Sequence, residues 1–198
     1  MESDRIIDEL AASFRQELAG CHERHRELLL IDWLGGISAR LVTGSSGNIE
    51  DRIWKKTVRL APMPDVAESL EQLHRQGVLL GALSNAYFSA RVIAGEMEMH
   101  RLLHYFRFVL SSGDLGIRKP DPIIFQEGIQ RAGRGVDEIW FVGDRYGEDV
   151  VGAISVGLQA VWMVAEELAV PPAPSVMVAR GWRDLMSQYD ETYQRKNG

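Results

Sequence analysis

The chain has 198 residues, of which 45% are hydrophobic, and this composition excludes a wholly disordered or fibrous protein. Its 22 basic and 28 acidic residues give a net charge of −6 without a basic stripe, so nucleic acid is not an expected partner. A single cysteine, Cys21, excludes a disulfide framework or cysteine-rich zinc site, and no long uncharged apolar stretch suits a membrane, which predicts a soluble cytoplasmic protein.

The first 60 residues are predicted to form helices only. Apolar residues recur at helical spacing in three segments, at 4–27, 28–42 and 49–60, with a loop at 43–48. Trp33 and Trp54 lie on the apolar faces of the second and third segments, where packing between helices is their expected role. Residues 1–60 are therefore predicted to form a helical subdomain.

Strands and helices alternate regularly from residue 61 onwards. The predicted strands lie at 78–83, 106–112, 138–142, 159–164 and, as a short edge strand, 175–178. The predicted helices lie at 62–76, 88–99, 121–132, 146–156 and 182–189, with a shorter one near 102. This alternation predicts an α/β fold with a doubly wound, mostly parallel sheet over residues 61–198.

Polar residues stand at the carboxyl ends of three predicted strands, which is where open α/β sheets bind their ligands. They are Ser84, Lys119 and Asp144. Each has a structural explanation when taken singly, since Ser84 and Asp144 suit helix caps and Lys119 suits an exposed loop. Asp149, five residues after Asp144, similarly suits the first turn of a helix.

Taken together, these residues match the needs of phosphoryl chemistry. A hydroxyl such as Ser84 can donate to phosphoryl oxygens, and the ammonium of Lys119 can offset their charge. The carboxylates of Asp144 and Asp149 are hard oxygen ligands of the kind that magnesium prefers.

Three segments resemble, in order, the second, third and fourth motifs of the haloacid dehalogenase-like (HAD) hydrolase superfamily. They are LGALSNAYFSARV, GIRKPDPIIFQEGI and WFVGDRYGEDVVGAISVGLQAVWM. The resemblance covers residues 62–164, and the helical segment 4–60 resembles the cap domain of many members. The GD-x4-D form of the last motif resembles the magnesium-dependent phosphatases of the superfamily.

The resemblance implies a role for each matching residue. Ser84 and the region of Asn85 would bind the phosphoryl group, and Lys119 would neutralise it together with the nucleophile. Asp144 would bind Mg²⁺, with Asp149 acting directly or through water. The implied activity is hydrolysis of a small phosphorylated metabolite through an aspartyl-phosphate, and the oligomeric state stays open.

One motif of the family is missing, the apolar strand followed by Asp-x-Asp-x-Thr that supplies the nucleophile. The segment most similar to this motif is LLLIDWLGG, which makes Asp32 a candidate relic nucleophile. The apolar residues of this segment, however, have helical spacing. We therefore expect that the chain begins beyond this motif, inside the cap. The resemblance places the missing strand between those that end at Leu83 and Val142, so its absence predicts a gap there.

Two hypotheses follow from the missing motif. In the first, the chain is a HAD-type phosphatase that lacks its nucleophile and is inactive as given. In the second, it is a non-catalytic HAD-like protein that binds magnesium with an anionic metabolite, or binds a protein partner. A response-regulator-like or flavodoxin-like module is disfavoured, because the chain begins with helices and has no paired acidic residues after an early strand.

Overall fold

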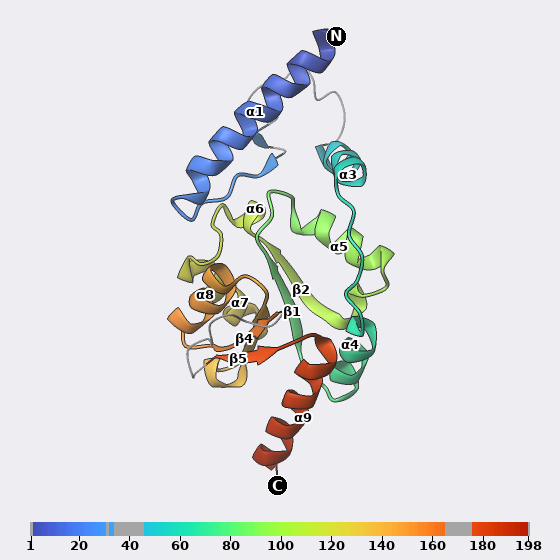
Figure 1. Cartoon of the computed structure of the whole chain (residues 1–198), viewed down its shortest axis with the longest axis vertical. Coiled ribbons are helices and arrows are strands. Elements are labelled where there is room, and N and C mark those ends of the chain that lie inside the picture. The colour runs from blue at the N-terminus through green and yellow to red at the C-terminus, as the bar shows by residue number, and fades with distance from the viewer. Residues whose placement is uncertain (1, 31, 34–45, 165–175, 198) are drawn as a thin grey trace.

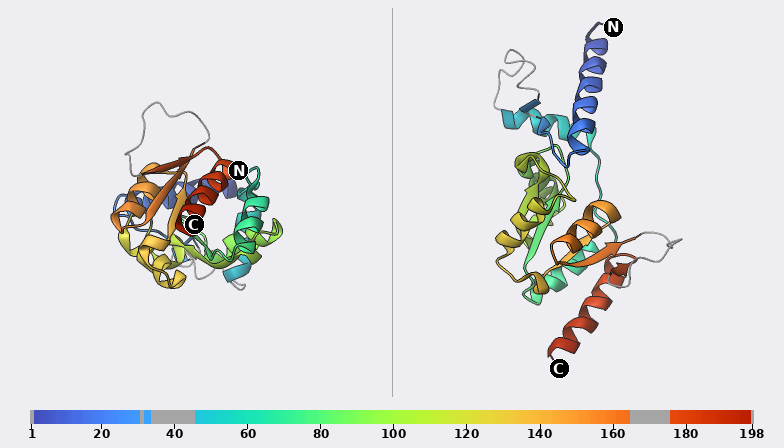
Figure 2. Two further views of the ribbon diagram at one scale, coloured as in Figure 1. Left: turned by 90° about the horizontal axis from the view of Figure 1, so that it is seen from below. Right: turned by 90° about the vertical axis from the view of Figure 1, so that its left-hand side faces the viewer.

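A computed structural model describes residues 2–30, 32–33, 46–164 and 176–197. Helices α1 (Glu2–His22) and α3 (Ser46–Thr57) lie at one end of the molecule, and α9 (Trp182–Asn197) projects from the other (Figure 1). The strands lie between these ends, and the side view shows how far α1 and α9 extend (Figure 2).

The amino-terminal block is helical, as predicted, but its boundaries differ. Helix α1 ends at His22 instead of residue 27, because His25 takes a positive φ of 53° and Arg26 then forms an antiparallel bridge with Ile117. Most of the predicted helix 28–42 lies outside the described residues, and Leu28 at its start is not helical. Helix α3 begins at Ser46, three residues earlier than expected.

The remainder alternates between strands and helices, as the sequence predicts. The strands are β1 (Leu80–Ser84), β2 (Phe106–Ser111), β3 (Trp140–Gly143), β4 (Gln159–Met163) and β5 (Met177–Ala179). The α-helices before, between and after them are α4 (Val66–Arg75), α5 (Ala90–Met99), α6 (Ser112–Leu115), α7 (Pro122–Ala132), α8 (Val151–Ser155) and α9. Shorter helical turns are η1 (Leu103–Tyr105), η2 (Val136–Glu138) and η3 (Tyr146–Val150).

Three local predictions differ in detail from the structure. Helix α6 was missed because it has only four residues; the Ser111 side chain accepts from the Gly113 N–H and Gly116 ends the helix. The predicted helix at 146–156 begins as a π-helical turn, η3, before α8. Helix α9 runs to Asn197 instead of Tyr189, because no glycine or proline interrupts this segment.

The described strands form two separate parallel sheets. One sheet has the order β1-β2, with Ser84 opposite Ser111, and the other has the order β3-β4-β5, with Gly143 opposite Trp162. Strands β1 and β3 are not hydrogen-bonded to each other. The predicted strands that end at Leu83 and Val142 therefore lie in different sheets, and the absence of a strand between them stays a prediction.

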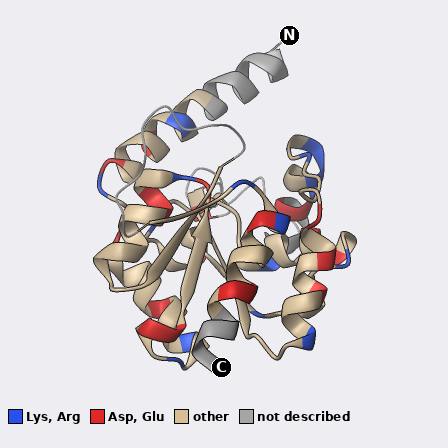
Figure 3. Cartoon of the chain, turned by 60° about the horizontal axis from the view of Figure 1, so that its bottom comes forward, with Lys and Arg blue, Asp and Glu red and all other residues tan. Residues whose placement is uncertain are grey.

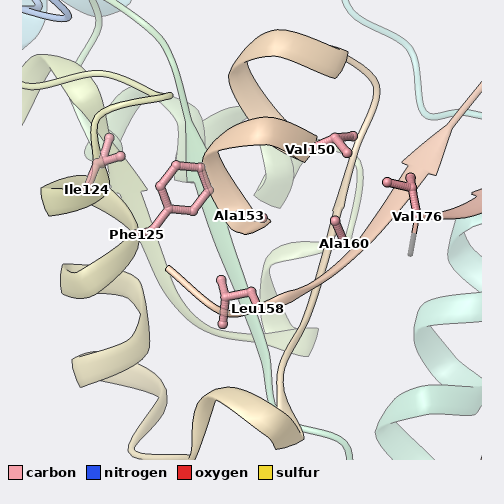
Figure 4. Packing of buried hydrophobic residues seen from close by; sticks show 7 residues of the cluster. All are labelled: Ile124, Phe125, Val150, Ala153, Leu158, Ala160 and Val176. Carbon is pink, nitrogen blue, oxygen red and sulfur yellow. The ribbon is translucent and has the colours of Figure 1, made fainter. Parts of the chain in front are cut away.

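The main hydrophobic core joins α7 and α8 to the second sheet. Its buried members come from α7, the end of η3, α8, β4 with the residue before it, and the residue before β5: Ile124, Phe125, Val150, Ala153, Leu158, Ala160 and Val176 (Figure 4). A second cluster ties the amino-terminal block to α5, and there Trp33 and Trp54 are buried as packing residues, as predicted.

Charged residues of both signs are interspersed over the described chain, without a basic face in the view of Figure 3. Among the described helices, none has the length and apolar character that crossing a membrane requires.

The start of α9 offers a test of pH-dependent stability. The Asp184 carboxylate accepts from the Arg180 N–H at 2.8 Å and from Gln188 Nε2 at 3.1 Å, and these bonds lower its pKa below 3.8. A lowered folded-state pKa stabilises the protein above the unfolded-state pKa, and this contribution is lost as the pH falls through the folded value. We expect Asp184→Ala to lower the free energy of unfolding by about 1 kcal/mol at pH 7 and by less at pH 3. Urea unfolding at both pH values measures this, and equal losses would contradict it.

Candidate active site

A cavity of about 370 Å³ lies between the ends of β1 and β3. Its lining combines the end of β1 and the turn after it, Lys119, and the end of β3 with the turn that follows: residues 82–85, 119, 142–145, 148 and 149. The carboxyl ends of both strands border the cavity. These ends are where α/β sheets bind their ligands. The structure therefore brings Ser84, Asn85, Lys119, Asp144 and Asp149 together.

A buried ion pair between Lys119 and Asp149 forms the base of the cavity. Lys119 Nζ donates to Asp149 Oδ1 at 2.6 Å and to the Leu83 carbonyl at 3.0 Å, and lies 5.3 Å from the centre of the Phe141 ring. Lys119 is 8% exposed and Asp149 3%. Two opposite charges this well removed from water depend on each other, because removal of either leaves the other unpaired.

The backbone at Gly143 and Arg145 fixes the position of the Asp149 carboxylate. Asp149 Oδ2 accepts from the Arg145 N–H at 2.9 Å across the turn of η3. A Cβ atom at Gly143 would lie 2.4 Å from Asp149 Cγ, so the glycine is needed for this close approach.

Asp144 differs from Asp149 because its side chain is exposed. Its backbone carbonyl accepts from Trp162 Nε1 at 3.0 Å, which anchors the residue, and Asp144 is one of the residues that line the cavity. No group of three or more His, Cys, Asp or Glu suited to a metal occurs in the described segments. Two carboxylates still fit Mg²⁺, which keeps several waters and commonly uses one or two protein carboxylates together with phosphate oxygens.

Asn85 forms hydrogen bonds with two other residues that line the cavity, Lys119 and Glu148. Its Nδ2 donates to the Lys119 carbonyl at 3.0 Å and to Glu148 Oε2 at 2.9 Å, and its Oδ1 accepts from the Lys119 N–H at 2.8 Å. These bonds position the Lys119 backbone. Ser84 precedes Asn85 as the last residue of β1 and also lines the cavity.

The sequence analysis did not identify two residues that line the cavity, Glu148 and Arg145. Glu148 accepts from Asn85 and lies 3.2 Å from Arg145 Nε and 3.5 Å from Arg118. The only sequence signal was the i, i+3 pair of opposite charges at 145 and 148, a spacing at which helical side chains are neighbours.

Asp32 is not among the residues that line the cavity. It is exposed and lies in a helical segment. Its backbone N–H donates to the Leu29 carbonyl at 3.1 Å, a local bond.

The fold and the cavity define an α/β protein with a ligand site at the carboxyl ends of parallel strands, built from carboxylates, a buried ammonium and hydrogen-bonding side chains. The profile of the family described as haloacid dehalogenase-like hydrolase matches residues 48–163. The chain belongs to this family.

Curated relatives of the chain include phosphatases. It is 32% identical over 166 residues to the glyceraldehyde 3-phosphate phosphatase of Methanopyrus kandleri, covering 81% of this chain and 68% of that protein. It is 29% identical over 120 residues to the phosphoserine phosphatase of Thermus thermophilus, covering 58% of this chain and 45% of that one. The chain thus spans about two thirds of the first relative and under half of the second.

A solved structure supports the same family. The HAD phosphatase from Thermococcus onnurineus is similar with a TM-score of 0.59 and 28% sequence identity, covering 71% of this chain and 64% of that chain. The resemblance to the HAD superfamily and the α/β fold class with parallel sheets are both confirmed.

Proposed function

We propose that this chain carries the phosphate and magnesium site of a HAD-type phosphatase that acts on a small phosphate monoester through an aspartyl-phosphate. The observation that supports this most directly is the convergence of Lys119, Asp144 and Asp149 with Ser84 and Asn85 on one cavity. The relatives named as phosphatases of small phosphorylated metabolites support the same substrate class.

Each side chain has a proposed role. Ser84 and the Asn85 region donate hydrogen bonds to phosphoryl oxygens, and Lys119 offsets their negative charge. Asp144 is the primary Mg²⁺ ligand, and Asp149 takes part directly or through water. The ion, when bound, supplies positive charge that stabilises the phosphoryl group.

Contacts of the amino-terminal block with the turn after β1 support a proposed role as a cap. The Leu30 N–H donates to the Tyr87 carbonyl in the turn after β1, and Glu50 accepts from the Ser89 N–H in the same turn. Residues 1–60 thus contact a loop at the carboxyl end of β1, which supports a role in covering the site and selecting substrates.

The cavity lining includes aspartates only at 144 and 149, both assigned to the metal. We therefore expect the chain by itself to bind ligands without turnover. This also supports the second candidate function, a HAD-like protein that binds magnesium and an anionic metabolite without catalysis.

Calorimetric titration of the purified chain with MgCl₂ and inorganic phosphate tests the proposed site. Asp144→Asn is expected to weaken Mg²⁺ binding about tenfold, because one charged ligand is lost. Asp137→Asn makes the same charge change in η2, which precedes β3, and is expected to leave binding unchanged.

The outcomes of this experiment are distinct. An absence of Mg²⁺-dependent phosphate binding would overturn the proposed site. Turnover of phosphate monoesters that disappears in Asp32→Asn would overturn the expectation that the chain by itself binds ligands without turnover.

A further inference from the structure

A buried arginine, Arg118, directly precedes Lys119 in the sequence but is not among the residues that line the cavity. Its guanidinium lies between two carboxylates. Nη1 is 3.5 Å from Oε2 of Glu27, and Nη2 donates to Oε1 of Glu148 at 3.5 Å. One cation therefore pairs with a carboxylate of the amino-terminal block and with a carboxylate of the cavity lining.

Glu27 and the backbone keep this guanidinium in place. The Glu27 carboxylate is buried, accepts from Ser112 Oγ at 2.8 Å and lies 2.9 Å from His22 Nε2. The Arg118 N–H donates to the His25 carbonyl at 2.9 Å, beside the antiparallel bridge between the two segments. Both ends of Arg118, its backbone and its side chain, are thus held by the amino-terminal block.

Glu148 needs a nearby cation because of where its carboxylate lies. Its Oε2 accepts from Asn85 Nδ2 at 2.9 Å, so Glu148 helps to hold the turn after β1. The same carboxylate adds a negative charge to the lining of a cavity that is proposed to bind phosphate, and like charges repel. Without compensation, the residue that holds Asn85 would also weaken the binding of an anion.

Two cations lie beside Glu148, and they differ in exposure to water. Arg145 Nε is 3.2 Å from Glu148 Oε2, but the Arg145 side chain is 67% exposed. The Arg118 side chain is 11% exposed. Water and salt screen an exposed charge far more than a buried one. Arg118 is therefore the main source of compensation for Glu148, although its distance is slightly longer.

We propose that Arg118 is a positioning residue of the phosphate site, and that its buried guanidinium balances the charge of Glu148 and so allows Glu148 to hold Asn85 beside an anionic ligand. Arg118 acts through Glu148 and does not touch the ligand. This role rests on the proposed function, because it concerns binding of the phosphoryl group. It differs from the role of Lys119, which itself lines the cavity and pairs with Asp149.

Three variants of the intact chain test this role by calorimetry. Arg118→Met removes the cation, Glu148→Gln removes the charge but keeps an acceptor for Asn85, and the double variant makes both changes. Each is titrated with MgCl₂ alone and with inorganic phosphate at saturating MgCl₂. Arg131→Met is the matched control, because Arg131 lies in α7, outside the cavity lining, and pairs with Glu127 of the same helix.

We expect Arg118→Met to bind phosphate about tenfold more weakly than the unmodified chain, because Glu148 is then uncompensated. Its affinity for Mg²⁺ should be unchanged or higher, because the cavity becomes more negative. Glu148→Gln should bind phosphate about threefold more tightly, because a repelling charge is lost. The double variant restores the net charge and should bind phosphate within about threefold of the unmodified chain. Arg131→Met should leave both affinities unchanged.

Circular dichroism first establishes that each variant is folded. Unchanged phosphate affinity in Arg118→Met would overturn the proposal, and so would a parallel loss of Mg²⁺ and phosphate binding, which a purely structural role would produce. Where Arg118→Met does not fold, the other two variants decide. A tenfold loss of phosphate affinity in the double variant, or no gain in Glu148→Gln, would overturn the charge balance.

The unmodified chain separates this proposal from the proposed function. If it binds no phosphate in the presence of Mg²⁺, the proposed function is wrong and the role of Arg118 falls with it. If it binds phosphate and Arg118→Met binds phosphate equally well, only the role of Arg118 is overturned.

Discussion

Replacement of Asp149 by alanine is expected to lower the free energy of unfolding by about 3–5 kcal/mol. The change leaves the ammonium of Lys119, which is 8% exposed, without its carboxylate partner at 2.6 Å. It also removes the acceptor of the N–H of Arg145, the residue just before η3. Urea unfolding followed by circular dichroism measures the loss, and a change below 1 kcal/mol would contradict the interdependence of the pair.

Two matched variants distinguish the effect of leaving Lys119 unpaired from a general disruption of the turn. Asp144→Ala removes an exposed carboxylate from the same turn and is expected to change stability by less than about 0.5 kcal/mol. The double variant Lys119→Met with Asp149→Leu removes both charges and is expected to be more stable than Asp149→Ala alone, because an apolar pair needs no compensation. A double variant less stable than the single one would argue against this account.

Replacement of Phe125 by alanine is expected to lower the free energy of unfolding by about 3–5 kcal/mol. The ring is 1% exposed and packs edge-on against Phe141, with centroids 5.0 Å apart. The Phe141 ring in turn faces Lys119 Nζ at 5.3 Å, so the core directly supports the cavity. Thermal and urea unfolding both report the loss.

Ile123, on the same helix, is the control for this prediction. It is 55% exposed, so Ile123→Ala should change stability by less than about 0.5 kcal/mol. Gly152→Ala tests the same contact from the other side, because its Cβ would lie 2.5 Å from the Phe125 ring. This overpacking should cost about 1–3 kcal/mol in the native chain and less in the Phe125→Ala background, where the ring is absent.

Much of the candidate site could be predicted from the chain alone because it depends on local order along the sequence. Ser84, Lys119 and Asp144 each follow an apolar strand, and parallel strands bring their carboxyl ends to one edge. The same reasoning could not find the contacts of Glu148, because its partner Asn85 is 63 residues away in sequence. It also could not foresee that Asp149 is engaged by Lys119, since ion pairing depends on side-chain geometry.

The helices also differ in how far the sequence alone predicts them. Periodicity located α7 and α9, but α6 has too few residues for a periodic signal, and the extent of α9 depended on the absence of a helix-breaking residue.

The sequence by itself determined the alternation of strands and helices, the family motifs and the polar residues at the strand ends, because hydrophobic period and motif order are local properties. Only the tertiary structure decided that Lys119 and Asp149 form a buried pair, that Asp32 lies outside the cavity lining, and that the carboxyl ends of β1 and β3 border one cavity. These features join residues far apart in the chain, and packing of the whole fold sets their distances and their exposure to water.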